Sequence, residues 1–187
     1  NMKRNRRISL LLFVVVSAVI LTVPGMMIYN SVRAEMVGEE FKFRIAPRDP
    51  VDFLRGRYLR LNVQPEQAKA GPGFADGRGS GLGFATLETD DEGYAAVTLV
   101  TLAPPKEKPY VRVETRSWYR TDDSEISINF PFSRYYMNEN KARVAETWLV
   151  KHGADKTIHV TVRVHNGYAA VVGLYVDGKP IEEVIVE

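Results

Sequence analysis

The sequence contains no cysteine among its 187 residues. This absence excludes disulfide bonds, thiolate metal sites, cysteine nucleophiles and a lipidated N-terminal cysteine. Histidine is also scarce, with three in the chain. His159 and His165 are six residues apart on the polar face of one expected strand, which separates them by about 20 Å and prevents them from sharing a metal ion. His152 ends an expected helix, where a cation suits the helix dipole. We therefore predict no metal site and no cofactor.

Charge of either sign is missing from residues 8–28, a run of 21 residues of which 13 are Leu, Ile, Val or Phe. A helix of this length spans about 31 Å, close to the roughly 30 Å of a bilayer's hydrocarbon core. Four basic residues precede the run: Lys3, Arg4, Arg6 and Arg7. The pattern predicts a basic cytoplasmic tail at 1–7, a single transmembrane helix at 8–28 and a juxtamembrane connector at 29–39.

A cleaved signal peptide is the alternative interpretation of this segment, because Val32-Arg33-Ala34 places small residues before Glu35. The apolar region of a signal peptide usually has about 7–15 residues, so the longer run here favours an uncleaved anchor. The basic residues before the run predict that the N-terminus is cytoplasmic. The rest of the chain is then expected outside the inner membrane, in the periplasm of a bacterium.

The region beyond the anchor has no excess of charge. The whole chain carries a net charge of +2, but subtracting the four basic residues of the tail from 25 Lys and Arg leaves 21, against 23 Asp and Glu, or −2. A surface that recognises nucleic acid is usually strongly basic. We therefore expect no nucleic-acid partner.

Alternating apolar and polar residues predict that residues 40–187 form one mostly antiparallel β domain, giving an α+β fold with one main soluble helix. The helix is expected at 138–152, capped by Asn138 and ended by Gly153. Turns are expected at 90–93, 121–124, Asn166-Gly167 and Asp177-Gly178. Residues 51–55 resemble a single helical turn, and residues 64–81 a long loop. The expected strands are 40–45, 57–63, 82–89, 94–102, 110–119, 125–130, 158–164, 168–176 and 181–186.

Four arginines occur within thirteen residues: Arg48, Arg55, Arg57 and Arg60. The planar guanidinium group matches both phosphates and carboxylates, so the cluster is a candidate site for lipid head groups or for a protein partner. The alternative is a solvated strand face that pairs locally with Asp49 and Asp52.

Aromatic residues cluster between 130 and 136: Phe130, Phe132, Tyr135 and Tyr136, next to Pro131 and Arg134. Aromatic side chains and arginine are enriched in the cores of protein interfaces, so Phe132, Arg134, Tyr135 and Tyr136 are candidate interface residues. Packing of an aromatic corner inside the domain is the alternative.

The sequence predicts no catalytic residue. The glycine-rich stretch 77–83 lacks the GxxxxGK[ST] spacing of a phosphate-binding loop, and no helix is expected after it. A serine–lysine pair, as in membrane-anchored signal peptidases, is compatible with the topology. No serine lies in a sequence that marks a nucleophile, however, and the candidate lysines fall in polar turns or helix ends rather than where burial would lower the pKa.

Several segments resemble the GDYXXLXY family of membrane-anchored bacterial proteins. They are Asp49-Pro50, Phe53-Leu54-Arg55-Gly56, Tyr58-Leu59-Arg60-Leu61, Gly93-Tyr94, 132–139 and 173–179. The family motif begins Gly-Asp-Tyr, whereas this chain has Gly56-Arg57-Tyr58 and has Val63 in place of the final tyrosine. The resemblance implies an anchored accessory domain, often encoded beside multi-pass membrane proteins, and it supplies no catalytic residue.

Three functions remain open from the sequence. The first is a non-catalytic accessory or structural subunit whose β domain covers the outer face of a multi-pass membrane partner and contacts bilayer lipids. The second is an extracytoplasmic ligand-binding or sensor module, which would need a concave pocket with convergent polar groups near 64–81. The third is an anchored hydrolase, which would need a serine within hydrogen-bond reach of a lysine or histidine.

Overall fold

The computed structural model describes residues 2–45, 58–65, 67–71, 74, 81–116 and 125–185. It confirms an α+β fold with an N-terminal apolar helix, antiparallel sheets and one main helix in the β-rich part. The elements are α1 (Met2–Val37), β1 (Glu39–Arg44), β2 (Tyr58–Arg60), β3 (Gln67–Lys69), β4 (Gly81–Thr89), β5 (Ala95–Thr101), β6 (Tyr110–Arg116), β7 (Glu125–Asn129), β8 (Arg134–Tyr136), α2 (Glu139–His152), the 3-10 turn η2 (Gly153–Asp155), β9 (Ile158–His165), β10 (Tyr168–Val176), β11 (Lys179–Pro180) and α3 (Ile181–Val184).

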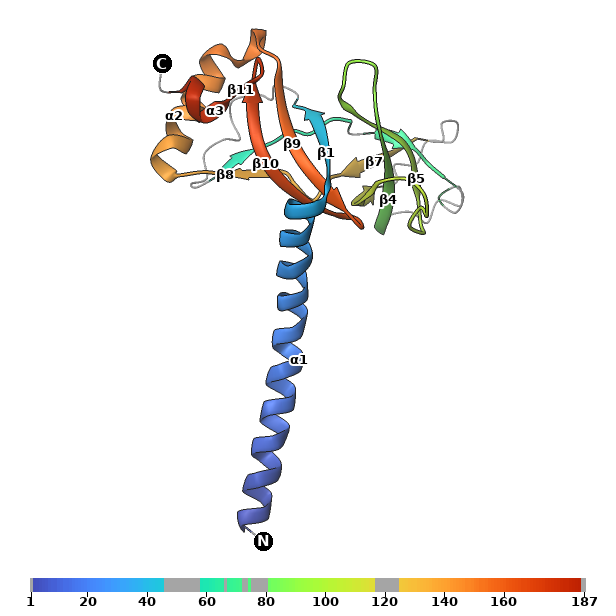
Figure 1. Cartoon of the computed structure of the whole chain (residues 1–187), viewed down its shortest axis with the longest axis vertical. Coiled ribbons are helices and arrows are strands. Elements are labelled where there is room, and N and C mark those ends of the chain that lie inside the picture. Colours follow the sequence, from blue (N-terminus) through green and yellow to red (C-terminus); the bar gives the residue numbers. More distant parts are fainter. Residues whose placement is uncertain are drawn as a thin grey trace.

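Helix α1 projects from the β-rich part as a long stalk (Figure 1). Its segment Leu10–Val37 is long and apolar enough to cross a membrane, with a mean hydropathy of 2.6, and its most apolar window is not buried against the rest of the chain. Residues 29–37, expected to be a connector, instead continue the helix. Gly38 alone separates α1 from β1.

The last turn of α1 packs against the sheet, and hydrogen bonds close its end. Ala34 is completely buried, and its carbonyl accepts a hydrogen bond of 2.9 Å from the Gly38 amide. Arg163 of β9 donates from Nη1 to the Glu35 carbonyl at 2.7 Å. These bonds satisfy carbonyl groups that the end of a helix would otherwise leave without a partner.

The first sheet has the order β1-β9-β10-β11, with every pair antiparallel. Its core face carries Phe41 and Phe43 of β1, which confirms the expected alternation at 40–45. Asn166 and Gly167 have φ values of 50° and 81° between β9 and β10. Two consecutive positive φ values identify the predicted type I′ turn.

The second sheet has the order β3-β7-β6-β4-β5 and curls until its two edges meet. Ala70, directly after β3, bridges Val100 of β5, and the Gly71 amide donates to the Val100 carbonyl at 2.7 Å. Residues 64–81 were expected to be a loop without strands, which is wrong for β3. A strand of three residues is too short to produce a recognisable alternation.

The C-terminal part combines a confirmed helix with a corrected strand. In α2, the Asn138 side chain accepts a hydrogen bond of 3.0 Å from the Asn140 amide, as predicted for its cap. Residues 181–186 were expected to form a strand, but residues 181–184 form α3. Pro180 has no amide to extend the ladder, and two glutamates in the first turn suit the positive end of a helix dipole. Ile181 at its start is fully buried.

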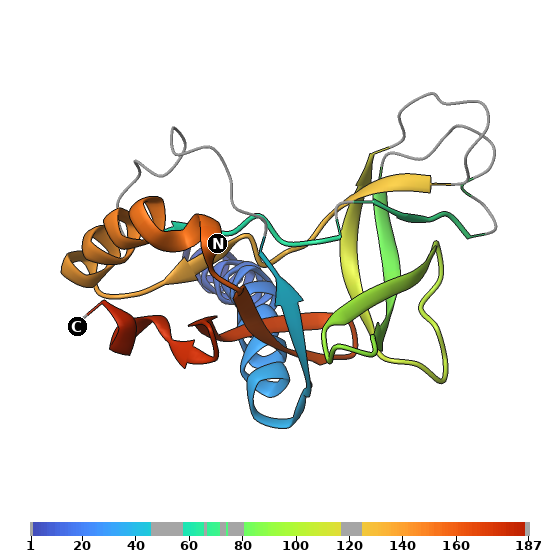
Figure 2. The same ribbon diagram turned by 90° about the horizontal axis from the view of Figure 1, so that it is seen from above.

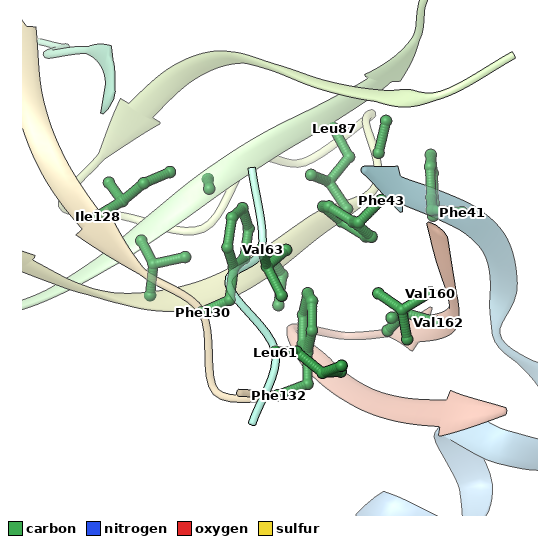
Figure 3. Close-up of a cluster of buried hydrophobic side chains, with 14 of the residues drawn as sticks. Phe41, Phe43, Leu61, Val63, Leu87, Ile128, Phe130, Phe132, Val160 and Val162 are labelled. Carbon is green, nitrogen blue, oxygen red and sulfur yellow. The ribbon is translucent and has the colours of Figure 1, made fainter. Parts of the chain in front are cut away.

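The four-stranded and the five-stranded sheet lie side by side (Figure 2), and three phenylalanine rings lie in the core that they share (Figure 3). A third, two-stranded sheet pairs β2 with β8. Phe43 of β1 lies 5.1 Å from Phe130 and 5.0 Å from Phe132, centroid to centroid. Phe130 and Phe132 are themselves stacked at 5.0 Å. Leu61 and Val63 pack into the same cluster (Figure 3). The segment after β7 therefore belongs to the centre of the molecule.

Candidate functional site

The structure places one of the four clustered arginines. Arg48, Arg55 and Arg57 lie outside the described residues, and so does the expected helical turn at 51–55. Arg60 lies in β2, where its Cα partner across the ladder is Arg134 of β8. The register thus places two arginines opposite each other, from the two clusters that the sequence analysis treated separately.

The aromatic cluster divides into buried and exposed residues. Phe132 has only 5% of its surface exposed, so its ring lies inside the domain and not on an exposed patch, and its role as an interface residue stays a prediction. Its ring packs against the rings of Phe43 and Phe130. Phe43 is far from Phe132 in the sequence, so local sequence patterns do not show this contact. For Phe130 and Phe132, packing inside the domain is the correct interpretation.

Tyr135 of β8 has a structural partner. It is half-buried, and its hydroxyl donates to Glu182 Oε1 of α3 at 2.5 Å. Burial raises the pKa of Tyr135, and the hydrogen bond to Glu182 raises it further. The phenol therefore stays protonated and holds β8 to the C-terminal helix.

Arg134 and Tyr136, on either side of Tyr135, are exposed. They line a groove of about 860 Å³, which we call the stalk-side groove. Its polar rim consists of Asn62, Arg112, Glu114, Arg116, Ser127, Asn129, Ser133, Arg134 and Tyr136. Its apolar lining consists of Leu61, Val63, Leu82, Val113, Ile128, Phe130, Pro131 and Phe132.

The rim on β6 follows from simple strand alternation. Val111 and Val113 point into the core, whereas Arg112, Glu114 and Arg116 are exposed on the opposite face. After Asn129 the chain leaves the second sheet and runs to β8, which pairs with β2. The groove lies between the exposed face of β6 and this departing segment.

The groove rim lies at the end of the domain nearest α1. Strand β1 rises away from the end of α1 (Figure 1), and Arg44 at its far end binds Asp90 in the β4–β5 turn at 3.0 Å. Leu82, near the start of β4, is therefore at the opposite, stalk end, together with its Cα partner Glu114.

The β8 part of the rim also faces the stalk. Tyr135 reaches Glu182 of α3, and successive side chains of a strand point to opposite sides. Arg134 and Tyr136 therefore point away from α3. Helix α3 and the stalk lie on opposite sides of β8 in Figure 1.

The electrostatics of the groove favour an anion. Arg112 is held in place because its Cζ lies 4.5 Å from the centroid of the Tyr168 ring and its Nη1 donates to the Tyr168 hydroxyl at 3.2 Å. Among the described residues of the lining, the charged side chains are Arg112, Arg116 and Arg134 and the carboxylate of Glu114. Such a rim can bind phosphate or carboxylate groups.

Sequence reasoning missed Arg112, Glu114 and Arg116 as site residues. The alternation of residues 110–116 identifies them as one exposed strand face. Their proximity to Arg134, however, depends on the path of the chain after β7, and no local pattern contains that path.

A second cluster surrounds His159 of β9. The sequence analysis placed His159 on a polar face, but only 8% of it is exposed. Its ring stacks on Tyr175 at 5.2 Å and meets Tyr94 edge to face at 5.9 Å. The guanidinium group of Arg44 lies over the Tyr94 ring, with its Cζ 4.1 Å from the ring centroid. The segments 93–94 and 173–179, which carry the family resemblance, therefore meet at one histidine.

The described residues contain no group of three His, Asp or Glu side chains placed to hold a metal ion. Within the same ranges, no hydrogen bond joins a serine hydroxyl to a lysine or a histidine. Lys156 pairs with Asp177 at 2.7 Å, and Lys108 pairs with Glu88. The absence of catalysis stays a prediction.

Comparison with known proteins gives one match. A family model described as GDYXXLXY protein matches residues 20–174, from the middle of α1 into β10. No curated protein and no solved structure matches the chain.

Proposed function

The chain belongs to the GDYXXLXY family, and on this premise we propose that it is a non-catalytic, single-pass membrane-anchored accessory or structural subunit of a larger membrane protein complex. In this proposal α1 crosses the inner membrane with its N-terminus in the cytoplasm. The β domain stands in the periplasm, over the outer face of a multi-pass partner.

The observation that carries the proposal is the stalk itself. Large apolar side chains of α1 between Leu10 and Val37 are 46–75% exposed, which is costly in water. Lipid tails and the helices of a partner are the surroundings that suit such a surface. The basic residues before the apolar run support a cytoplasmic N-terminus.

The rigid junction between α1 and β1 supports a positioning role. Since the helix reaches Val37 and Gly38 alone precedes β1, rotation or tilt of α1 is transmitted directly to the domain. A partner that packs against α1 would therefore also fix the orientation of the β domain. A freely tethered enzyme or binding module has no need of such a junction.

Fractionation and mild-detergent purification of the full chain from its native host test this proposal. The wild-type protein is expected in the membrane fraction, with a protease-accessible domain on the periplasmic side, and to copurify with a defined multi-pass protein. Val15→Arg should reduce membrane insertion, because arginine near the centre of a spanning helix costs about 2.5–3.5 kcal/mol.

Val144→Arg provides the matched control, because Val144 on α2 is 50% exposed and outside the apolar segment. It should leave membrane insertion unchanged. Recovery of the wild-type chain as a lone monomer under mild conditions would contradict the subunit proposal, and a soluble mature chain would contradict the anchor.

An extracytoplasmic ligand-binding or sensor module is the second candidate, and the stalk-side groove favours it. Its volume lies within the roughly 300–1,000 Å³ typical of ligand sites, and it has convergent polar groups. A sensor of this kind would change its membrane partner's activity when the ligand is added. A structural subunit would be required for assembly whether or not the ligand is present.

A further inference from the structure

We propose that the stalk-side groove binds the anionic head group of a membrane phospholipid. The inference rests on the membrane placement of α1 in the proposed function. It does not depend on the identity of the partner.

Charge is the first argument. The lining brings Arg112, Arg116 and Arg134 to one cavity, and Glu114 is the acidic residue among the described residues that line it. A guanidinium group binds phosphate oxygens through paired hydrogen bonds, which makes each such contact strong and geometrically specific. The Tyr168 ring under Arg112 orients that side chain before any ligand arrives.

Position is the second argument. If residues 8–28 fill the hydrocarbon core, the helix continues through residues 29–37 for about 13 Å. Its last turn, with the buried Ala34, already contacts the domain, so the domain begins close to the head-group layer, which is about 5–8 Å thick. Strand β4 begins at the stalk end of the domain (Figure 1), and Leu82 near its start lines the groove, so this end of the groove is expected to lie near the layer that contains lipid phosphates.

The apolar lining is the third argument. Leu82 is 70% exposed and Tyr136 is 66% exposed, and both line the groove together with the exposed Pro131. A small inorganic anion has no apolar atoms to pack against these surfaces. A phospholipid carries a phosphate next to glycerol and acyl carbons. Its phosphate suits the arginines of the lining, and its carbon atoms suit the apolar residues.

Titration with short-chain lipids tests the proposal. The purified full-length protein, in a nonionic detergent, is titrated with dihexanoyl phosphatidylglycerol or dihexanoyl phosphatidylcholine below their micelle-forming concentrations, and binding is followed by NMR. Saturable binding of the anionic lipid to one site is expected, with affinity at least about tenfold above that of the zwitterionic lipid.

Four variants locate the site. Arg116→Gln and Arg134→Gln should each weaken binding about tenfold, because each removes a charged donor. Arg143→Gln, on the exposed surface of α2, should leave the affinity unchanged. Glu114→Gln should strengthen binding several-fold, because it removes the repelling carboxylate, and a misfolded protein cannot show such a gain.

Two results support the lipid proposal: selective binding of the anionic lipid, and opposite effects of Arg116→Gln and Glu114→Gln. Equal affinity for inorganic phosphate overturns the lipid as the ligand and assigns the groove to free phosphate. Displacement by an acidic peptide at lower concentration assigns it to a protein partner. If Arg116→Gln and Arg134→Gln bind the lipid as tightly as the wild type, the groove is not the binding site, and the lipid binds to α1 instead.

The outcomes also separate this inference from the proposed function. Copurification with a multi-pass partner tests the subunit role and does not depend on the arginines of the groove. Lipid titration in detergent needs no partner. A protein that binds its partner but no anionic lipid would overturn the inference alone.

Discussion

Arg163 of β9 donates from Nη1 to the backbone carbonyl of Glu35, 2.7 Å away and 128 residues earlier in the chain. Its Nε also lies 3.6 Å from the Glu40 carboxylate at the start of β1. One side chain therefore contacts the end of α1 and the first strand on either side of Gly38. This side chain therefore ties the end of α1 to the first strand of the sheet.

Replacing Arg163 by methionine should loosen this junction without unfolding the domain. The Glu35 carbonyl would lose its charged donor, at a cost of about 1–3 kcal/mol if no water replaces it. Amide hydrogen exchange should accelerate at residues 35–40 and stay unchanged in α2. Arg143→Met is the matched control, and equal exchange in the two variants would contradict the role of Arg163.

Gly38→Ala should damage the same junction more severely. A Cβ atom at position 38 would lie 2.3 Å from the Ala34 carbonyl oxygen and 2.9 Å from the Val164 amide nitrogen. Both neighbours are backbone atoms, so α1 and β9 would have to separate. The free energy of unfolding should fall by about 2 kcal/mol or more. It is measured by unfolding the β domain in urea and following its spectroscopic signal.

Gly81→Ala offers the control for this prediction, because no atom lies within 4 Å of a Cβ at position 81. It should change the free energy of unfolding by less than about 0.5 kcal/mol. Similar losses in both variants would show that the close approach at Gly38 is relieved at little cost.

Phe132 and Tyr136 should respond very differently to truncation, although they are four residues apart. Phe132→Ala opens a cavity between the two sheets and should cost about 3–5 kcal/mol of stability. Tyr136→Ala removes a side chain that is 66% exposed and should cost less than about 1 kcal/mol. Thermal unfolding of both variants checks the contrast, and comparable losses would contradict the buried position of Phe132.

The sequence predicts the elements that depend on local patterns. Alternation at residues 40–45 and 158–164 predicted β1 and β9, and Asn166-Gly167 predicted the turn after β9, because these signals need only neighbouring residues. The cap at Asn138 is local in the same way. The short strand β3 and helix α3 escaped prediction, since three or four residues contain too few repeats of a strand or helix pattern to be recognised.

The candidate site was only partly predictable for a different reason. Arg134 and Tyr136 were identified from their aromatic and basic neighbours, but their partners on β6 are about 20 residues earlier in the chain. Those partners come together because the segment after Asn129 leaves one sheet and pairs in another. The same path of the chain from β7 to β8 buries Phe132. It therefore explains why Arg112, Glu114 and Arg116 were not predicted as site residues and why Phe132 was expected to be exposed.

Acidification should destabilise the domain through His159. Burial lowers the pKa of His159 below its usual value of 6.5, and the positive charge of Lys42 lowers it further. As the pH falls, the unfolded chain binds a proton at about 6.5, before the folded chain does. Stability is therefore full above that pH and decreases as the pH falls below it, until the folded-state pKa is passed.

His159→Phe isolates this effect, because phenylalanine keeps an aromatic ring beside Tyr175 and Tyr94 but does not titrate. Asp90 and Asp177 also stabilise the fold, since hydrogen bonds lower their pKa values below 3.8, so their contributions are lost only in stronger acid. Burial raises the pKa of Glu146 above 4.5, which opposes the histidine effect but is common to both proteins. The difference between wild type and variant in the urea midpoints at pH 7.5 and 5.0 therefore reports on the histidine. The wild type should lose about 1.4 kcal/mol per unit of pKa depression, and the variant should lose clearly less. An equal loss in both would assign the acid sensitivity to other groups and leave the histidine–tyrosine stack a packing feature only.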